Sequence, residues 1–196
     1  MIIYEYTNKM YIARQDLRQI RRIIVADYRE TVDYILGIPL FAQKIGKENL
    51  SSLLCRLGNP EKSIPAVHVA GTNGKGSTCR ALAQMLTGMG YRVGLFTSPH
   101  LVSINERIQI DGENISDADF VWAFETVKEK FTQHPSFFEV MFAMAAVYFR
   151  EKKCDFVVYE TGMGGRLDAT NVLMPELSII TSVGMDHMEY LGDTIE

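Results

Sequence analysis

The chain has 196 residues, a hydrophobic content of 47% and a formal net charge of −4, with 20 Lys and Arg against 24 Asp and Glu. This composition is that of a globular protein with one substantial core, and it excludes a disordered or fibrous chain. The slight acidity argues against a nucleic-acid partner, because such partners bind where basic residues are concentrated.

The cysteines and the apolar runs indicate a cytoplasmic protein. Cys55, Cys79 and Cys154 are odd in number and lack metal-ligand spacing, so they are interpreted as reduced core thiols. The amino terminus has no basic stretch followed by a long apolar one, and the apolar run from Val140 to Phe149 is too short to span a bilayer. We therefore expect no membrane partner.

The first part of the chain is predicted to be helical. Apolar residues at three- and four-residue steps predict a helix from about Gln15 to Leu36, which Gly37-Ile38-Pro39 ends. A second helix from Lys47 to Leu57 is predicted to end at Gly58-Asn59-Pro60. Residues 1–64 are thus expected to lead into a domain that occupies residues 65–196.

That domain is predicted to be an α/β fold. Short apolar runs predict strands at 66–70, 93–97, 107–110, 156–159 and 177–183. Helices are predicted after the first strand through Met89, over 116–131 with a Ser116 to Asp119 capping-box spacing, and over 137–150. Strands that alternate with helices and are apolar on both faces indicate a mostly parallel sheet flanked by helices.

A glycine-rich loop joins the first predicted strand to the following helix. Its residues are Gly71, Thr72, Asn73, Gly74, Lys75, Gly76 and Ser77. The glycines let backbone N–H groups converge, the helix N-terminus adds partial positive charge, and Lys75 adds a full charge, so a P-loop for a nucleoside triphosphate is predicted. The usual P-loop has Ser or Thr after the lysine to bind Mg²⁺, whereas Gly76 stands here, so metal ligands are expected elsewhere.

Four segments resemble the folylpolyglutamate synthase/dihydrofolate synthase family, a branch of the Mur ligase superfamily. They are 69–78, then 97–101 with 105–108, then 160–171, then 186–192, in the family's order. The similarity runs from about Tyr34 to the end and implies the P-loop-containing fold of the Mur ligase central domain. Thr161 stands where the family more often has a small or branched apolar residue.

The resemblance implies an ATP-dependent ligase. In that family ATP phosphorylates the carboxylate of dihydropteroate or a reduced folate, and the amine of L-glutamate attacks the acyl phosphate to form an amide, with release of ADP and phosphate. Catalysis then rests on positioning and charge neutralisation rather than on a protein nucleophile. The implied cofactors are ATP and Mg²⁺, and the full-length enzyme is expected to be a monomer. Whether it adds the first glutamate, extends a polyglutamate tail or does both stays open.

The resemblance also assigns roles to individual residues. The glycine loop would hold the ATP phosphates, and Ser98, Glu160 and His187 match the family's magnesium ligands, so Lys75, Glu160 and His187 are the expected catalytic residues. Glu160 follows a buried strand, where a carboxylate is costly unless it is paired, which favours a metal role independently. His187 is a less natural ligand, because Mg²⁺ prefers oxygen.

The pterin acid is expected near two further segments and a loop at Gly37 to Lys44. The matching residues are Ser136, Phe137, Phe138, Glu139, Leu167, Asp168 and Ala169. A phenylalanine could stack on a flat ring, and Glu139 or Asp168 could accept its N–H groups. Without the resemblance, core packing is the simpler interpretation of both phenylalanines. His68 is interpreted as structural, and His100 as a residue that orders the loop beside Ser98.

The family continues with a lysine-containing segment and a second, Rossmann-like lobe. We therefore expect a chain truncated before the C-terminal lobe, with little catalysis of its own. Two alternatives are another Mur-type amino-acid ligase and a P-loop nucleotide-binding module. Gly76 and the segment 165–171 argue against the first, and the joint presence of Ser98, Glu160 and His187 argues against the second.

Overall fold

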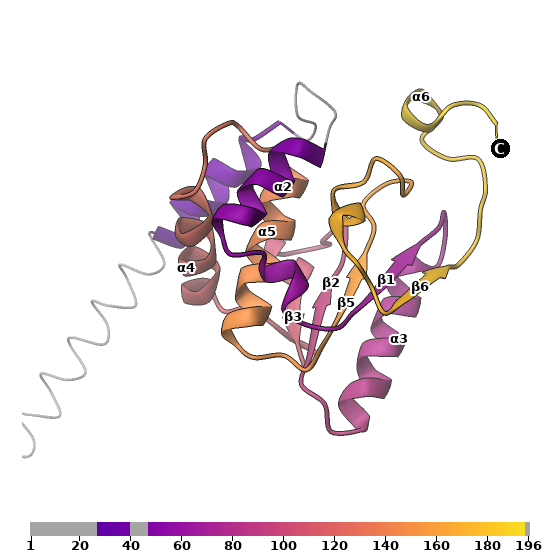
Figure 1. Cartoon of the computed structure of the whole chain (residues 1–196), viewed down its shortest axis with the longest axis horizontal. Helices are drawn as coiled ribbons and strands as arrows, with labels where there is room; N and C mark the ends of the chain where they lie inside the picture. Colours follow the sequence, from indigo (N-terminus) through magenta and orange to yellow (C-terminus); the bar gives the residue numbers. More distant parts are fainter. Residues whose placement is uncertain (1–26, 40–46, 195–196) are drawn as a thin grey trace, which may run out of the picture.

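A computed structural model of the chain describes residues 27–39 and 47–194 (Figure 1). Of the helix expected from Gln15 to Leu36, residues 27–36 are helical and the rest lies outside the described residues. Of the loop expected at Gly37 to Lys44, only residues 37–39 are described. The remaining predicted helices and strands all fall within the described part.

Six strands form one sheet in the order β4-β3-β2-β5-β1-β6. Their bounds are β1 Ala66–Ala70, β2 Val93–Phe96, β3 Ile108–Ile110, β4 Glu113–Asn114, β5 Phe156–Glu160 and β6 Leu177–Ile180. The strands β2, β5, β1 and β6 are parallel to one another, and β3 and β4 form an antiparallel hairpin at one edge. The predicted α/β fold with a mostly parallel sheet is confirmed, while β4 was not predicted.

Helices cover both faces of this sheet (Figure 1). The α-helices are α2 Lys47–Arg56, α3 Lys75–Gly88, α4 Asp117–Lys128, α5 Phe137–Glu151 and α6 Met188–Leu191, and the short 3₁₀ helices are η1 Pro60–Lys62, η2 Ile104–Arg107 and η3 Ala169–Val172. The helix α3 connects β1 to β2 on one face, whereas α5 leads into β5 on the other face with α2 and α4 beside it. The helix that was predicted to reach Phe131 ends at Lys128.

The larger core lies between α5 and the sheet. Every residue of α5 from Val140 to Phe149 is buried, which accounts for the long apolar run in the sequence. Side chains alternate along β5, so Val157 and Tyr159 face this core and Val158 faces α3. In the part of the chain that the structure describes, no helix combines the length and apolarity needed to cross a membrane.

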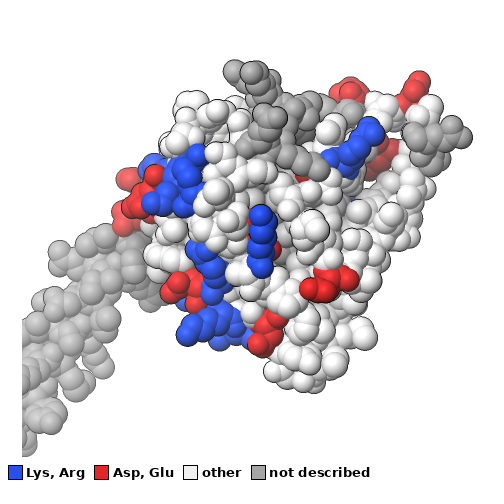
Figure 2. Space-filling view, viewed as in Figure 1, with Lys and Arg blue, Asp and Glu red and all other residues white. Residues whose placement is uncertain are grey.

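Charged side chains are mixed over the face shown in Figure 2. Lysine and arginine side chains lie next to aspartate and glutamate side chains rather than in one continuous basic area. Lys128 and Glu125 form an ion pair within α4 at 3.2 Å. Lys152, at the end of α5, forms an ion pair with Asp119 of α4 at 2.9 Å. Both pairs are partly exposed, so they contribute little to stability.

Candidate active site

The glycine loop lies at the carboxyl end of β1 and leads into α3. Lys75 folds back across it, because its Nζ donates to the carbonyl oxygens of Gly71 at 2.8 Å and Thr72 at 3.2 Å. Gly74 is the N-cap of α3 with a φ of 83°, and Gly71 has a φ of 135°. A Cβ atom at Gly71 would also collide with Thr181 Oγ1. Both positions therefore require glycine.

The segment after β6 forms hydrogen bonds with this loop. These contacts were not predicted from the sequence. The Thr72 N–H donates to the carbonyl oxygen of Ser182 at 2.7 Å, and the Thr181 hydroxyl donates to the carbonyl oxygen of Asn73 at 2.7 Å. The Gly184 N–H donates to Thr72 Oγ1 at 2.9 Å. Because β6 pairs with β1 in parallel, the carboxyl ends of the two strands lie together. Polar residues directly after β6, such as Thr181 and Ser182, were the sequence feature from which these contacts could have been predicted.

Glu160 ends β5 and is buried beside the start of α3. The residue is 3% exposed, and its Oε2 accepts a hydrogen bond from the Ser98 N–H at 2.9 Å. Both carboxylate oxygens lie 3.6 Å from the point that a Cβ atom at position 76 would occupy, so Gly76 leaves room for them. Burial raises the pKa of Glu160, and the Ser98 N–H and the nearby Lys75 partly oppose that shift.

Of the three expected magnesium ligands, the structure brings Ser98 and Glu160 together. His187 is exposed, has a φ of 48° as the N-cap of α6, and lies 3.8 Å from Asp186. No hydrogen bond or ion pair links it to Ser98 or Glu160 within the described residues, and Figure 1 shows α6 beyond the sheet. The side chain of Leu191 in α6 lies against Gly164, so α6 is near the loop after β5.

The ligand types at Glu160 fit a hard cation. Among the described residues, no group of three His, Cys, Asp or Glu side chains could hold a metal ion. An ion at Glu160 would therefore need other ligands, such as the Ser98 hydroxyl and phosphate oxygens, which suit Mg²⁺. The raised pKa of a buried carboxylate also indicates a site that a cation would stabilise.

Asp168 organises the loop between β5 and β6. As the N-cap of η3, its Oδ1 accepts hydrogen bonds from the Thr170 N–H at 2.9 Å and from the Thr170 hydroxyl, and its Oδ2 accepts from the Met163 N–H at 2.8 Å. His68 Nε2 lies 2.7 Å from Thr170 Oγ1. Because that hydroxyl donates to Asp168, His68 Nε2 is the donor. This hydrogen bond ties β1 to the loop, a specific role for His68 that the sequence did not predict.

The start of α5 contains four of the residues expected to bind the pterin acid. Ser136 and Glu139 form a capping box, in which Glu139 Oε2 accepts from the Ser136 N–H at 2.7 Å and from its hydroxyl at 2.9 Å. Phe137 is buried, and the guanidinium carbon of Arg107 lies over its ring, 5.0 Å from the ring centroid. Phe138 is only half-buried. Glu139 and Phe137 thus support the helix start, and Phe138 is the more accessible ring.

The two segments expected to bind the pterin acid meet at Gly162. A Cβ atom there would lie 2.8 Å from Phe138 Cζ and 3.1 Å from Asp168 Oδ2. Leu167 is 62% exposed next to Asp168, and Ala169 is half-buried. The structure therefore places the Phe138 ring and the Asp168 loop side by side.

Arg107 lies near these residues and was not singled out as a site residue from the sequence. It is 8% exposed, and its Nε donates to His100 Nδ1 at 2.8 Å, so His100 orders the loop after Ser98 as expected. Neighbouring Glu106 accepts the N–H groups of residues 101–103 at 2.8–3.0 Å. Burial lowers the pKa of Arg107, and Glu160 opposes that shift. The only sequence feature that could have marked Arg107 as a site residue was its position in the family-like segment 105–108.

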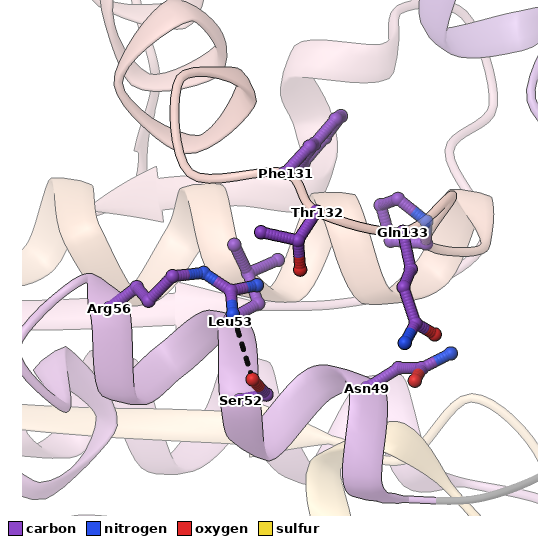
Figure 3. Close-up of a pocket in the computed structure, with 8 residues that line it drawn as sticks. Asn49, Ser52, Leu53, Arg56, Phe131, Thr132 and Gln133 are labelled. Atoms are coloured by element: carbon purple, nitrogen blue, oxygen red, sulfur yellow. Dashed lines mark hydrogen bonds between the residues drawn. The ribbon is translucent and has the colours of Figure 1, made fainter.

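A separate pocket lies between α2 and the segment after α4 (Figure 3). Its volume is about 30 Å³, which accommodates about two water molecules and no pterin ring. Its lining residues are Asn49, Ser52, Leu53, Arg56, Phe131, Thr132, Gln133 and Pro135. None of them belongs to the predicted site.

Comparisons with known proteins agree with the family that the four sequence motifs indicate. The Mur ligase middle domain family matches residues 69–196. The dihydrofolate synthase/folylpolyglutamate synthase of Bacillus subtilis (strain 168) is 48% identical over 177 residues, which are 86% of this chain and 41% of that protein. This chain spans 41% of the length of that protein and 41% of the length of the folylpolyglutamate synthase of Lacticaseibacillus casei.

Solved structures of similar proteins share the fold. An FPGS–AMPPCP–folate complex has a TM-score of 0.82 and 41% identity, over 86% of this chain and 43% of that chain. Mycobacterium tuberculosis folylpolyglutamate synthase complexed with ADP has a TM-score of 0.81 and 36% identity, over 88% of this chain and 40% of that chain.

Proposed function

Because this chain belongs to the Mur ligase family through its middle domain, we propose that it is the ATP-binding part of a folylpolyglutamate synthase/dihydrofolate synthase. The whole enzyme would join L-glutamate to the carboxylate of dihydropteroate or of a reduced folate, with cleavage of ATP to ADP and phosphate. The 48% identity to the Bacillus subtilis enzyme supports this reaction, and the AMPPCP, folate and ADP complexes of relatives support these ligands. We propose a cytoplasmic monomer.

One observation carries the proposal: the buried Glu160 carboxylate lies beside Ser98 and against the first turn of α3, where the glycine loop ends. The N-terminus of α3 and Lys75 would hold the ATP phosphates. Glu160 and Ser98 would hold Mg²⁺, and His187, which this structure leaves exposed and apart from both, would have to approach them to act as the third ligand. When bound, Mg²⁺ would neutralise charge on the phosphate oxygens.

The proposed chemistry needs no protein nucleophile. An oxygen of the acceptor carboxylate attacks the γ-phosphorus of ATP, and the bond from that phosphorus to ADP breaks with its electron pair passing to ADP. The amine nitrogen of glutamate then attacks the carbonyl carbon of the acyl phosphate. Phosphate leaves with the electron pair of the broken C–O bond, the nitrogen loses a proton, and an amide is formed. The protein positions the reactants and offsets their charge.

We place the pterin portion of the acceptor next to Phe138 and the loop of Asp168. The half-buried Phe138 offers a ring surface for stacking, and Asp168 has oxygen lone pairs that could accept pterin N–H groups. Leu167 and Ala169 flank Asp168. Ser136, Phe137 and Glu139 would support this site through the capped start of α5.

The test is release of ADP by the full-length enzyme that contains this chain, with ATP, Mg²⁺ and L-glutamate. We expect release with dihydropteroate or tetrahydrofolate and none with a cell-wall precursor. Lys75→Ala should lower the rate roughly a hundredfold or more, because it removes a charge from the transferring phosphate. Lys128→Ala, which removes a lysine of α4 outside the glycine loop, is the matched control, and its rate of ADP release should equal that of wild type.

Other outcomes would assign the chain differently. Turnover with the cell-wall precursor and not with the pterins would indicate another Mur-type ligase. Nucleotide binding without acceptor-dependent ADP release would indicate a nucleotide-binding module. The 196-residue chain alone is expected to show little glutamate-dependent ADP release, and substantial release would contradict this expectation.

A further inference from the structure

Arg107 carries a buried positive charge that the described residues do not neutralise. The residue is 8% exposed and lies 5.0 Å from the Phe137 ring centroid, and its Nε donates to His100. Within residues 27–39 and 47–194, its two terminal nitrogens have no hydrogen-bond acceptor and the guanidinium forms no ion pair. Neither terminal nitrogen is among the fully buried side-chain atoms of the described residues that have no partner, so both keep contact with solvent and can reach a ligand. Arginine does not lose its proton, and a largely buried charge without an acidic partner is unfavourable, so an anion is expected to complete this site.

The nearby acidic side chains are committed elsewhere. Glu106 accepts three backbone N–H groups of the loop at residues 101–103. Glu160 is close enough to affect the pKa of Arg107, but its carboxylate accepts from Ser98 and lies against Gly76. Neither acid pairs with the guanidinium, so its terminal nitrogens are left for an anion from outside these residues.

The sheet order separates Arg107 from the phosphate-binding loop. Arg107 directly precedes β3, and Ile108 pairs with Phe96 at the carboxyl end of β2. With β2 and β5 between β3 and β1, Arg107 lies three strand spacings, roughly 14 Å, from the glycine loop after β1. Glu160, the last residue of β5, lies between them. Lys75 and α3, which would bind the ATP phosphates, are on one side of Glu160, and Arg107 is on the other side.

We propose that Arg107 binds the reacting carboxylate of the acceptor acid through its two terminal nitrogens and holds it for attack on the γ-phosphorus. The planar guanidinium matches a carboxylate with two parallel hydrogen bonds. His100 fixes Nε and Phe137 lies against the guanidinium face, so the fork is held in place before the acceptor binds. This inference rests on the proposed function and adds the residue that selects an acid as acceptor.

Equilibrium binding to the full-length enzyme tests the proposal, with saturating AMPPCP and two ligands, dihydropteroate and its uncharged carboxamide. Wild-type enzyme should bind the acid roughly ten- to a hundredfold more tightly than the amide, the range expected for a bidentate charged pair. Arg107→Gln should reduce acid affinity to that of the amide and leave amide affinity unchanged. AMPPCP affinity should also stay unchanged.

Two further variants keep the test decisive. Arg107→Lys retains the charge but not the planar fork, so it should lose part of the preference for the acid. This variant decides the question if thermal unfolding shows that Arg107→Gln does not fold. Arg56→Gln, on α2 with its guanidinium bonded to Ser52 and the Lys130 carbonyl, is the matched control and should bind both ligands as wild type does.

If Arg107→Gln weakens the binding of acid and amide equally, then Arg107 has only a structural role and the proposal is overturned. Weaker binding of AMPPCP alone would assign the anion to the nucleotide and also overturn it. If wild-type enzyme binds no pterin acid, the proposed function fails. The same acid and amide comparison is then made with whichever acceptor supports ADP release, and equal affinity for its two forms would overturn the role of Arg107 separately.

Discussion

The two faces of the sheet bury very different amounts of apolar surface. Under α5, the Phe142 ring packs against Phe96 and Tyr159 with centroids 6.1 and 5.2 Å apart, and all three residues are buried. Under α3, the second core cluster is small, and Met85 and Met89 are 66% and 70% exposed. Figure 1 shows α2, α4 and α5 gathered on the first face and α3 on the second.

This difference separates stability from nucleotide binding. The α5 face provides most of the hydrophobic free energy, whereas α3 buries only Cys79 and Ala83 and begins at the glycine loop. Elements that bind ligands are commonly among the less stable parts of a fold. The comparison predicts that substitutions on the α5 face change stability most.

The largest expected effect is that of Phe142→Ala. Removing a ring that is 0% exposed leaves a cavity and should lower the free energy of unfolding by about 3–5 kcal/mol. Leu82→Ala, at a half-buried residue of α3, is the control and should cost about 1–2 kcal/mol. Urea unfolding followed by circular dichroism measures both. Equal losses would show that the two faces contribute equally.

The next effect is expected at Thr170, in η3, which contacts α2 and α5. Thr170→Val removes the acceptor of the His68 N–H and one of the two hydrogen bonds to Asp168 Oδ1, which keeps the Thr170 N–H, and this should cost about 1–3 kcal/mol. Thr126→Val is the control, because its hydroxyl lies on the exposed side of α4. Urea midpoints compare the two, and a Thr170→Val midpoint equal to that of wild type would show that the hydrogen-bond chain adds no stability.

The sequence predicted the elements whose physics is local. The glycine loop followed from Gly71, Gly74 and Lys75 and from the strand before them, and the family inferred from four motifs is confirmed. The short strand β4 was missed because two residues give no alternation to detect, although Asp111 and Gly112 form a hairpin turn with φ values of 54° and 86°.

Contacts between distant segments could not be read from the sequence. His68 was interpreted as structural without a partner, because its hydrogen bond to Thr170 joins residues 102 positions apart. The buried state of Arg107 depends on His100 and on Phe137 from α5, and no local pattern carries that information. The roles of the site residues stay predictions, and the structure adds which of them are adjacent.

The α5 face also contains a polar defect at Glu61, in η1. Glu61 is 6% exposed, its Oε2 has no partner among the described residues, and burial raises its pKa, with Lys62 and Arg150 opposing. Between the ordinary glutamate pKa and the raised one, the native state binds more protons than the unfolded state. Stability from this group is therefore greatest at low pH and is lost as the pH rises through the raised pKa.

Glu61→Gln should remove this pH dependence and stabilise the protein at pH 8 by about 1 kcal/mol, because an amide carries no buried charge. Urea unfolding at pH 4.5 and pH 8 measures the difference. Glu125→Gln, at an exposed position of α4, is the control and should change neither value. A variant that is destabilised more at pH 8 than at pH 4.5 would show that the Glu61 charge is stabilising.

The smallest expected effect is at Thr161, and its sign is opposite to that at Thr170. Both residues are 0% exposed, but Thr161 Oγ1 has no hydrogen-bond partner among the described residues, whereas Thr170 Oγ1 has two. Valine replaces that hydroxyl with a methyl group of similar size, so Thr161→Val should leave stability unchanged or raise it by about 1 kcal/mol. Urea midpoints of the two variants form a matched pair at equal burial. A loss at Thr161 as large as that at Thr170 would mean that the Thr161 hydroxyl does have a partner.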